Sequence, residues 1–377
     1  MSLLFLCGSR GEWGYIRPII DICRKKNIKY GICLTNMVLL ENHGNLSKEI
    51  KDNEYNVIDE IEMALEGNTH YSMAKSLSLF GLSFNETLKR EKPSWLILAG
   101  DRGEQLMGAI NAAYTYTPVA HIQAGERSGN IDGTARHAIT RFAHIHFAAN
   151  KDAYNRLLRN GEEKFRIFNV GAPQLDEIKN NKITNFKKFK NKHKLENIKK
   201  YFLVVFHSVT EEFLKTKKNT HNLIEALGKF KQNKIWILPN NDAGSSFVKN
   251  KILENREVGT YIFNNFSRED YLSLLKNSEL IVGNSSSGIL EAPSFKKITI
   301  NIGNRQNNRM QAISTINSNN KTEDIIKKIK IGLSKKFKER IKKVKNPYGK
   351  GNSSQKIIDI LNKTKITDKL IVKKITY

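Results

Sequence analysis

Short apolar runs followed by polar turns recur along the whole chain, with helical patterns between most of them. The predicted strands are 3–9, 29–35, 95–101, 119–125, 144–150, 201–208, 234–240, 260–266, 279–285 and 297–303. Predicted helices include 15–26, with Pro18 in its first turn, 69–90, 269–278 and 286–295. This strand–helix alternation predicts parallel sheets that are covered by helices on both faces.

The chain has 377 residues, which is too long for one compact core and suits two domains. A polar, Lys- and Asn-rich stretch at 173–200 separates the two series of predicted strands. We therefore predict an α/β protein with doubly wound domains at 1–172 and 173–350 and a C-terminal helix or tail at 351–377. In such folds a ligand lies at the carboxyl ends of the strands, here in a cleft between the domains.

The formal net charge of +26 raises the alternative of a polyanion-binding protein. Lys is accompanied by abundant Asn and Ile, which fits a biased codon composition, so we expect neither a nucleic acid nor a membrane as partner. The first apolar run is too short for a signal peptide, and no run approaches the roughly 18 residues of a membrane span. Three cysteines, Cys7, Cys23 and Cys33, form no disulfide framework, and we expect a reduced, cytoplasmic protein.

Polar residues cluster where six of the predicted strands end, in both halves of the chain, which favours a single interdomain site. The clusters are 8–11, 100–104, 123–127, 207–208, 240–244 and 283–288. The last, Gly-Asn-Ser-Ser-Ser-Gly before a helical pattern, combines small residues with hydroxyl donors and the free N–H groups of a helix start. It is a candidate diphosphate site or an ordinary helix cap, and it is not a Walker loop because no Gly-Lys-Ser/Thr closes it.

Several motifs together resemble the hydrolysing UDP-N-acetylglucosamine 2-epimerases of sialic-acid-type biosynthesis. They are GSRGEWGYIRPI, AGDRGEQ, PVAHIQAGE, IDGTARHAITRFAHIHFAAN, FNVGAPQLDEI, YFLVVFHSVTEE, REDYLSLLKNSELIVGNSSSGILEAPSF and INIGNRQNNR, in order over about residues 1–350. The resemblance implies two Rossmann-like domains that face each other across a nucleotide-sugar cleft, as in many glycosyltransferases. It implies conversion of UDP-N-acetylglucosamine, or a UDP-2,4-diacetamido-trideoxy sugar on the way to legionaminic acid, and water to UDP and the free manno-configured sugar.

The resemblance also implies roles for individual residues. The acid/base candidates are Asp101 and Asp132, with Arg136 one helical turn after Asp132, and His207 is expected at the leaving phosphate. Glu291 falls where the family binds the ribose hydroxyls. The other expected substrate contacts are Arg10, Arg102, Gln123, Asn284, Ser285, Ser286, Ser287, Gly288 and Arg305. Because relatives form dimers or tetramers, we expect a homo-oligomer. We expect no cofactor, and we expect no metal because the histidines show no ligand spacing.

The chain also departs from the family pattern. Gln123 stands where many relatives have Glu or His, so either Glu126 supplies that carboxylate or the role is not universal. Gly133 stands where relatives often carry a second acid, and Thr35-Asn36-Met37-Val38 stands where the family has Thr-Gly-Met-His. These changes leave the sugar's 4- and 6-substituents open. Alternatives are a glycosyltransferase on the same scaffold and a non-hydrolysing epimerase.

Overall fold

Two parallel sheets organise the chain, and each is assembled from one of the two series of strands. The computed structural model describes residues 1–65, 67, 69–129, 131–374 and 376, and within these ranges the sheets have seven and six strands. The first sheet comprises β1 (Ser2–Cys7), β2 (Lys29–Thr35), β3 (Val57–Ile61), β4 (Trp95–Ala99), β5 (Val119–Ile122), β6 (Ile145–Ala148) and β7 (Ile167–Asn169). The second comprises β8 (Tyr201–Val205), β9 (Asn233–Ile237), β10 (Thr260–Phe263), β11 (Leu280–Gly283), β12 (Ile298–Ile302) and β13 (Thr315–Ser318).

Strand β1 shows why these runs form central strands. Leu3, Phe5 and Cys7 point into one core while Leu4 and Leu6 point into another, as the two-residue period of a strand requires. Both faces are apolar, so the strand is stable only where helices cover the sheet on both sides. The run LLFLC therefore specifies a strand in the middle of a parallel sheet.

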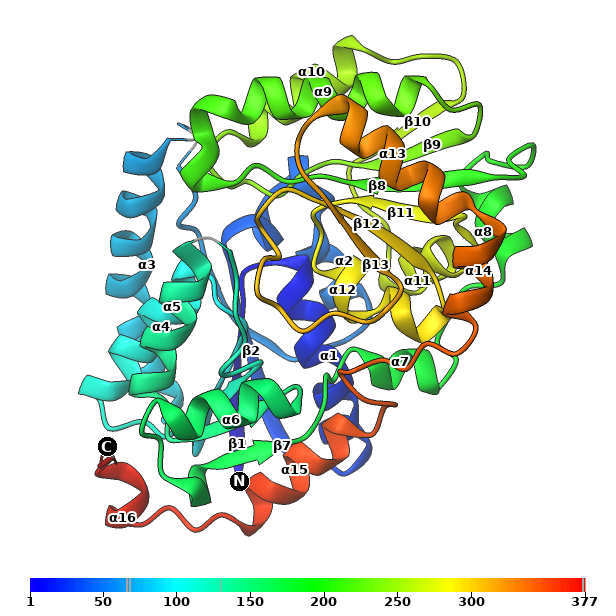
Figure 1. Ribbon diagram of the computed structural model, residues 1–377. Helices are drawn as coiled ribbons and strands as arrows, with labels where there is room; N and C mark the ends of the chain where they lie inside the picture. The colour runs from blue at the N-terminus through cyan, green and yellow to red at the C-terminus, as the bar shows by residue number, and fades with distance from the viewer. Residues whose placement is uncertain (66, 68, 130, 375, 377) are drawn as a thin grey trace.

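Helices cover both faces of the first sheet (Figure 1). Helices α3, α4 and α5 contribute to the core on one face, and α1, α2, α15 and α16 contribute to the core on the other. The helices that follow strands of this sheet are α1 (Arg10–Lys25), α2 (Leu46–Asp52), α3 (His70–Glu91), α4 (Gly103–Tyr114), α5 (Ile131–Phe142), α6 (Lys151–Arg159) and α7 (Leu175–Lys179).

The second sheet repeats this arrangement, with α9, α10 and α13 on one face and α8 and α11 on the other. Its helices are α8 (Phe186–Lys192), α9 (Thr216–Gly228), α10 (Ser245–Glu254), α11 (Arg268–Asn277), α12 (Ser287–Leu290), α13 (Thr322–Leu333) and α14 (Lys335–Ile341). The two Lys-rich stretches of the sequence, 185–200 and 325–343, hold α8 and most of α13 and α14. Buried Phe189 and Ile329 anchor these helices, while their lysines remain at the surface.

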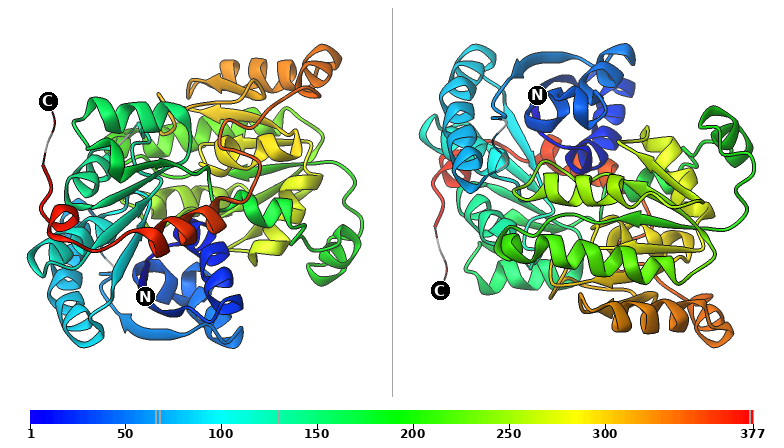
Figure 2. Two further views of the ribbon diagram at one scale, coloured as in Figure 1. Left: turned by 90° about the horizontal axis from the view of Figure 1, so that it is seen from below. Right: turned by 90° about the horizontal axis from the view of Figure 1, so that it is seen from above.

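The C-terminal segment returns to the amino-terminal half of the molecule (Figure 2). Helix α15 (Ser353–Lys363) packs against α1 through Ile357, Ile358 and Leu361, and each such burial stabilises the fold by about 1.5–3 kcal/mol. Helix α16 (Asp368–Ile371) follows, and its Leu370 carbonyl accepts a hydrogen bond from the buried Arg166 guanidinium at 2.7 Å. The predicted boundaries at 172 and 350 stay a prediction, and residues 375 and 377 of the predicted tail lie outside the described residues.

Strand order places the ligand crevice. The orders are β3-β2-β1-β4-β5-β6-β7 and β10-β9-β8-β11-β12-β13, so the direction of progression reverses between β1 and β4 and between β8 and β11. Loops that leave the carboxyl ends of strands at such a reversal diverge and open a crevice. The polar clusters at 8–11, 100–104, 207–208 and 283–288 all follow these four strands.

Two local predictions were wrong. Helix α1 begins at Arg10 instead of after Gly14, because the Ser9 hydroxyl accepts from the Glu12 N–H and caps the helix there. Pro18 consequently lies within the helix and not in its first turn. The helix predicted at 286–295 is only α12 followed by a 3₁₀ turn, Ala292–Phe295, with Pro293 near its start.

Candidate active site

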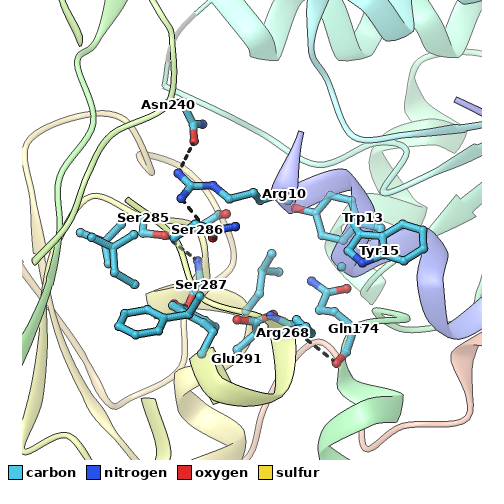
Figure 3. Close-up of a pocket in the computed structure, with 18 of the residues that line it drawn as sticks. Arg10, Trp13, Tyr15, Gln174, Asn240, Arg268, Ser285, Ser286, Ser287 and Glu291 are labelled. Atoms are coloured by element: carbon cyan, nitrogen blue, oxygen red, sulfur yellow. Dashed lines mark hydrogen bonds and ion pairs between the residues drawn. The ribbon is translucent and has the colours of Figure 1, made fainter. Parts of the chain in front are cut away.

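A cavity of about 160 Å³ lies between the two sheets at the carboxyl ends of their strands. We call it the serine-loop cavity because Ser285, Ser286 and Ser287 form part of its wall (Figure 3). Both halves of the chain contribute to it, as the sequence analysis predicted for a single interdomain site. Its other lining residues include Arg10, Trp13, Tyr15, Gln174, His207, Asn240, Arg268, Tyr271, Glu291 and Arg305.

We call residues 283–288 the serine loop. It begins at a glycine that no other residue replaces easily. Gly283 ends β11 with φ +134°, and a Cβ there would lie 2.0 Å from the Val205 carbonyl oxygen. The Ser285 hydroxyl accepts from the Ser287 N–H at 3.4 Å, and Tyr271 and Ser287 share a hydrogen bond between their hydroxyls. Because α12 spans only four residues, hydroxyl and N–H groups of the loop, and not a long helix dipole, are what it offers to an anion.

His207 lies in the loop that follows β8, and it is buried near three arginines. Its Nδ1 accepts a hydrogen bond from the Asn240 N–H at 3.2 Å, which assigns the remaining hydrogen to Nε2. Burial, and then the nearby charges of Arg305, Arg10 and Arg102, hold the pKa of His207 well below its ordinary value. The imidazole is therefore neutral and is a hydrogen-bond donor at Nε2.

Three guanidinium groups give the serine-loop cavity a positive wall. Arg10 reaches from the start of α1 to the opposite half, where it donates to the Asn264 carbonyl at 2.7 Å and to Asn240 at 3.3 Å. Arg305 donates to the Asn284 carbonyl at 3.2 Å, and its buried Nε has no hydrogen-bond partner among the described residues. Arg268 is the third, although Glu177 and Glu291 balance its charge.

The pKa values of Asp101 and Asp132 are shifted in opposite directions. Asp101 follows β4 and accepts hydrogen bonds from the Ser128 hydroxyl at 2.9 Å and from Arg136, which is 1% exposed. Burial alone would raise the pKa of Asp101, but the charges of Arg136 and Arg309 lower it below its usual range. Asp132 lies in the first turn of α5, and burial, followed by the charge of Asp101, raises its pKa to about 7.

Arg305 connects these acids to the serine-loop cavity. Its charge acts on both Asp101 and Asp132, and its side chain lines the cavity. The backbone confirms the close approach of the two halves, because the Gly129 N–H donates to the Arg305 carbonyl at 3.0 Å. A Cβ at Gly129 would lie 1.8 Å from the Asn304 carbonyl oxygen, so only glycine fits there.

A second cavity, of about 770 Å³, is lined in part by Asp132. We call it the α3–α4 cavity because Met73 and Leu77 of α3 and Leu106 of α4 form its apolar wall. Asn240 lines both cavities, and Arg102 lines this one and not the serine-loop cavity. Asp132 thus lines the larger, partly apolar cavity, and Arg305, whose charge acts on it, lines the serine-loop cavity.

Several predicted contact residues occupy other positions. Arg102 does not line the serine-loop cavity but binds Asp242 at 3.0 Å, since that carboxylate approaches from the opposite half. Asn284 binds the backbone of His207, and Gly288 faces β12, where a Cβ would lie 2.6 Å from the Thr299 Cγ2 atom. Gln123 is buried with φ +66°, and its side-chain amide has no hydrogen-bond partner among the described residues.

Glu126 is committed to a buried network. One oxygen accepts from Asn150, and the other accepts from Arg309 and from the Tyr348 hydroxyl, each at 3.2 Å. Like Asp101, it lines neither cavity, but its side chain is 2% exposed, whereas that of Asp101 is 20% exposed. This geometry gives Glu126 a role in holding the two halves together and does not support the expectation that it replaces the carboxylate missing at Gln123.

Several lining residues of the serine-loop cavity were not among the predicted site residues, including Arg268, Tyr271 and Gln174. Arg268 binds Glu177 at 2.7 Å and also binds Glu291, whose second oxygen is buried without a partner among the described residues. Tyr271 binds Ser287, and Gln174 has no partner for its buried amide in the described part of the chain. An arginine in the first turn of a helix opposes the helix dipole, and that was the one available signal for Arg268.

The described residues hold neither a metal-binding cluster nor a helix that could span a membrane. No group of three or more His, Cys, Asp and Glu side chains in these residues is placed to hold a metal ion. None of the described helices combines the length and the apolar character that crossing a bilayer requires.

Comparison with known proteins places this geometry in a family. The sequence model of the UDP-N-acetylglucosamine 2-epimerase family matches residues 21–362. The UDP-N,N'-diacetylbacillosamine 2-epimerase (hydrolyzing) of Legionella pneumophila is 33% identical, over 96% of this chain and 95% of its own. The GDP/UDP-N,N'-diacetylbacillosamine 2-epimerase (hydrolyzing) of Campylobacter jejuni is 31% identical, over 90% of this chain and 89% of its own.

A solved structure shares the arrangement of the two sheets. The UDP-GlcNAc 2-epimerase from Neisseria meningitidis, in its crystal structure bound to UDP-GlcNAc, superposes with a TM-score of 0.80. The match covers 97% of this chain and 100% of that one at 21% identity, so it bears on the fold alone. From the family match and the relatives above 30% identity, the chain belongs to the UDP-N-acetylglucosamine 2-epimerase family.

Proposed function

We propose that the protein is a hydrolysing 2-epimerase that converts a UDP-linked 2-acetamido sugar and water to UDP and the free manno-configured sugar. One observation carries the proposal. The charge of Arg305, which lines the serine-loop cavity, acts on two carboxylates: Asp101, whose pKa is lowered, and Asp132, whose pKa is raised. Such a pair suits removal and return of a proton next to a departing diphosphate.

The reaction needs a base because the proton at C2 of the sugar is only weakly acidic. Asp132 has the higher proton affinity, so we assign it to the removal of that proton while the C1–O bond to UDP breaks and a glycal forms. Water then supplies the hydroxyl at C1 and gives its proton to Asp101, which Ser128 and Arg136 hold ionised. We assign Asp101 to passing this proton to C2 on the opposite face, while Asp132 releases the proton it removed to the solvent.

Departure of UDP places negative charge on the diphosphate, and the serine-loop cavity supplies donors for it. His207 offers Nε2–H, Arg10 and Arg305 offer guanidinium groups, and Ser285 and Ser286 offer hydroxyls. Fixed donors in a site with little water stabilise such charge more strongly than the same groups would in solution. Glu291 is the candidate acceptor for the ribose hydroxyls.

The apolar wall of the α3–α4 cavity favours a sugar with apolar substituents. Met73, Leu77 and Leu106 lie in the cavity that borders Asp132, and a methyl or acetamido substituent contacts such a wall better than hydroxyls do. The two relatives above 30% identity are named for diacetylbacillosamine, a 2,4-diacetamido sugar. We therefore propose UDP-2,4-diacetamido-2,4,6-trideoxyglucose as a better substrate than UDP-N-acetylglucosamine.

The proposed product is a precursor of sialic-acid-type sugars, and we place the enzyme in the cytoplasm with those nucleotide sugars. A homo-oligomer is part of the proposal. Tyr71 and Leu82 of α3 and Tyr114 of α4 are 85%, 75% and 83% exposed, an apolar surface that supports association between copies. Light scattering coupled to size exclusion measures the mass in solution, and a mass of 43.1 kDa contradicts the oligomer.

The deciding experiment is incubation with each of the two UDP-sugars in heavy water, followed by NMR. We expect free manno-configured sugar with deuterium at C2, together with UDP, and faster turnover of the diacetamido substrate. Release of a UDP-linked epimer identifies a non-hydrolysing enzyme. Turnover without deuterium at C2 contradicts the proton-transfer chemistry.

A further inference from the structure

A network of five side chains bridges the two halves next to Asp132. Three belong to the amino-terminal half: Asn36 after β2, Arg102 before α4 and Glu104 in α4. Two belong to the loop between β9 and α10: Asn241 and Asp242. We call these five residues the interdomain latch.

Four of the five side chains form a closed ring of hydrogen bonds, and Asp242 joins it through Arg102. Asn241 donates to Asn36 at 2.7 Å, Asn36 donates to Glu104 at 3.1 Å, and Arg102 donates to Glu104 at 3.0 Å. Arg102 also donates to Asp242 at 3.0 Å and to Asn241 at 3.4 Å. The latch therefore has two arms across the cleft, an ion pair between Arg102 and Asp242 and an amide pair between Asn36 and Asn241.

Asn36 anchors the amide arm of the latch. Its φ of +52° lies in the left-handed region, where glycine is the least strained residue. Asn36 is buried, and the latch uses both its amide oxygen and its amide nitrogen. The amide that glycine would lack is thus the part that reaches the other half.

The latch brings a charge from the carboxy-terminal half to the candidate base. Four charged groups act on Asp132: Asp101 from the loop after β4, Asp242 from the loop after β9, Arg305 from the loop after β12, and Arg102. After burial and Asp101, the Asp242 carboxylate is the next cause that raises the pKa of Asp132, while Arg305 and Arg102 lower it. Asp242 can act in this way only when its loop lies against the amino-terminal half.

We propose that Asp242 is a positioning residue that the interdomain latch holds against Asp132, so that closure of the two halves prepares the base for proton transfer. The role of Asp132 in this inference rests on the function proposed above. Asp242 itself need not touch the sugar, because it acts through its charge and through its hold on Arg102.

The test compares Asp242→Asn with Asp324→Asn. Both changes keep the shape and remove one carboxylate from the carboxy-terminal half, but Asp324 binds Ser318 and the Asn319 N–H and lines neither cavity. Removal of a neighbouring negative charge lowers the pKa of Asp132, and it also leaves Arg102 with Glu104 as its one remaining carboxylate partner among the described residues, which acts in the same direction. We expect the titration of Asp132 to move to lower pH by about one unit in Asp242→Asn and not in Asp324→Asn.

Asp132 can be followed directly, without turnover, by NMR of protein with ¹³C-carboxyl-labelled aspartate, its signal being assigned by its loss in Asp132→Asn. The pH profile of kcat/KM should move by the same amount. An Asp132 titration that is the same in wild type and Asp242→Asn overturns the inference. If wild type makes no free sugar but Asp242→Asn shows the expected NMR shift, the proposed function is overturned, and only the charge coupling between Asp242 and Asp132 stands.

The amide arm has its own matched pair. Asn36→Gly removes the side chain at a left-handed position that glycine accepts, and Asn27→Gly makes the same change at φ +54° on the exposed end of α1. We expect Asn36→Gly to lower kcat about tenfold, to change UDP affinity little and to shift Asp132 as Asp242→Asn does. Equal behaviour of Asn36→Gly and Asn27→Gly removes the amide arm from the proposal.

Discussion

The side-chain amide of Asn284 binds both backbone polar groups of His207. Its Oδ1 accepts from the His207 N–H at 2.7 Å, and its Nδ2 donates to the His207 carbonyl at 2.8 Å. The two residues follow β8 and β11, the strands on either side of the point where the strand order reverses. One buried amide therefore fixes the imidazole relative to the serine loop.

Replacing Asn284 with Ala should weaken both the fold and the binding of UDP. Two buried backbone groups of His207 lose their partner, so we expect the free energy of unfolding to fall by about 1–3 kcal/mol. UDP affinity should fall about tenfold because His207 is no longer held toward the cavity. Urea unfolding and calorimetric titration with UDP measure the two effects.

Asn301→Ala is the matched control for this prediction. Asn301 is also buried, but its amide donates to Asn317 at 2.8 Å and not to the backbone of His207. It should cost stability and leave UDP affinity unchanged. An Asn284→Ala protein that binds UDP like wild type means that the imidazole does not depend on this clamp.

Asp101→Asn should abolish turnover and retain UDP binding. The amide keeps the shape of the carboxylate, but it cannot hold a proton for C2, and it leaves the Arg136 charge without its partner. Release of free sugar and calorimetric titration with UDP separate the two effects. Asp59→Asn is the control because it breaks an aspartate–arginine pair, with Arg90 at 2.9 Å, outside the cleft. Full activity of Asp101→Asn would refute its catalytic assignment.

The pH dependence of kcat/KM should follow Asp132. Burial and the charge of Asp101 raise its pKa to about 7, and the base must be unprotonated to remove the C2 proton. The rate should therefore rise with pH through neutrality, and at pH 6 it should be about one tenth of its plateau value. A profile that is flat between pH 6 and 8, in protein that remains folded, contradicts the assignment of Asp132 as the base.

The central strands were predictable from sequence, and so was the edge strand β10, but the other three edge strands were not. β1, β4 and β8 are continuous apolar runs because both of their faces are buried. β3, β7 and β13 were missed: they are edge strands with a neighbour on one side only, and their sequences, VIDEI, IFN and TINS, are short or polar. Their pairing depends on the strand beside them, which local sequence does not contain.

The site divides in a similar way. Residues at strand ends, such as Arg10, Asp101 and Ser285, were identifiable because a strand followed by a polar turn is a local pattern. The partners that decide what each residue does come from distant parts of the chain. Arg102 was expected at a phosphate, but Asp242, 140 residues away, binds it instead.

Glu291 should determine whether the protein distinguishes UDP from 2′-deoxy-UDP. One of its oxygens binds Arg268, and the other is buried without a partner among the described residues, beside the serine-loop cavity. A ribose hydroxyl would satisfy that oxygen, and a hydrogen bond to a charged acceptor contributes about 1.5–3 kcal/mol. We expect wild type to bind UDP at least about tenfold more tightly than 2′-deoxy-UDP, and Glu291→Ala to lose this preference.

Glu177→Ala separates the ribose contact from the support of Arg268. Glu177 binds the same guanidinium at 2.7 Å but does not line the cavity, so its removal leaves Arg268 with one carboxylate, as Glu291→Ala does. Glu177→Ala should weaken both nucleotides equally and keep the preference for UDP. If both variants lose the preference, Arg268 and not Glu291 senses the ribose. If neither variant loses it, the ribose lies elsewhere in the cavity and the buried oxygen of Glu291 has another role.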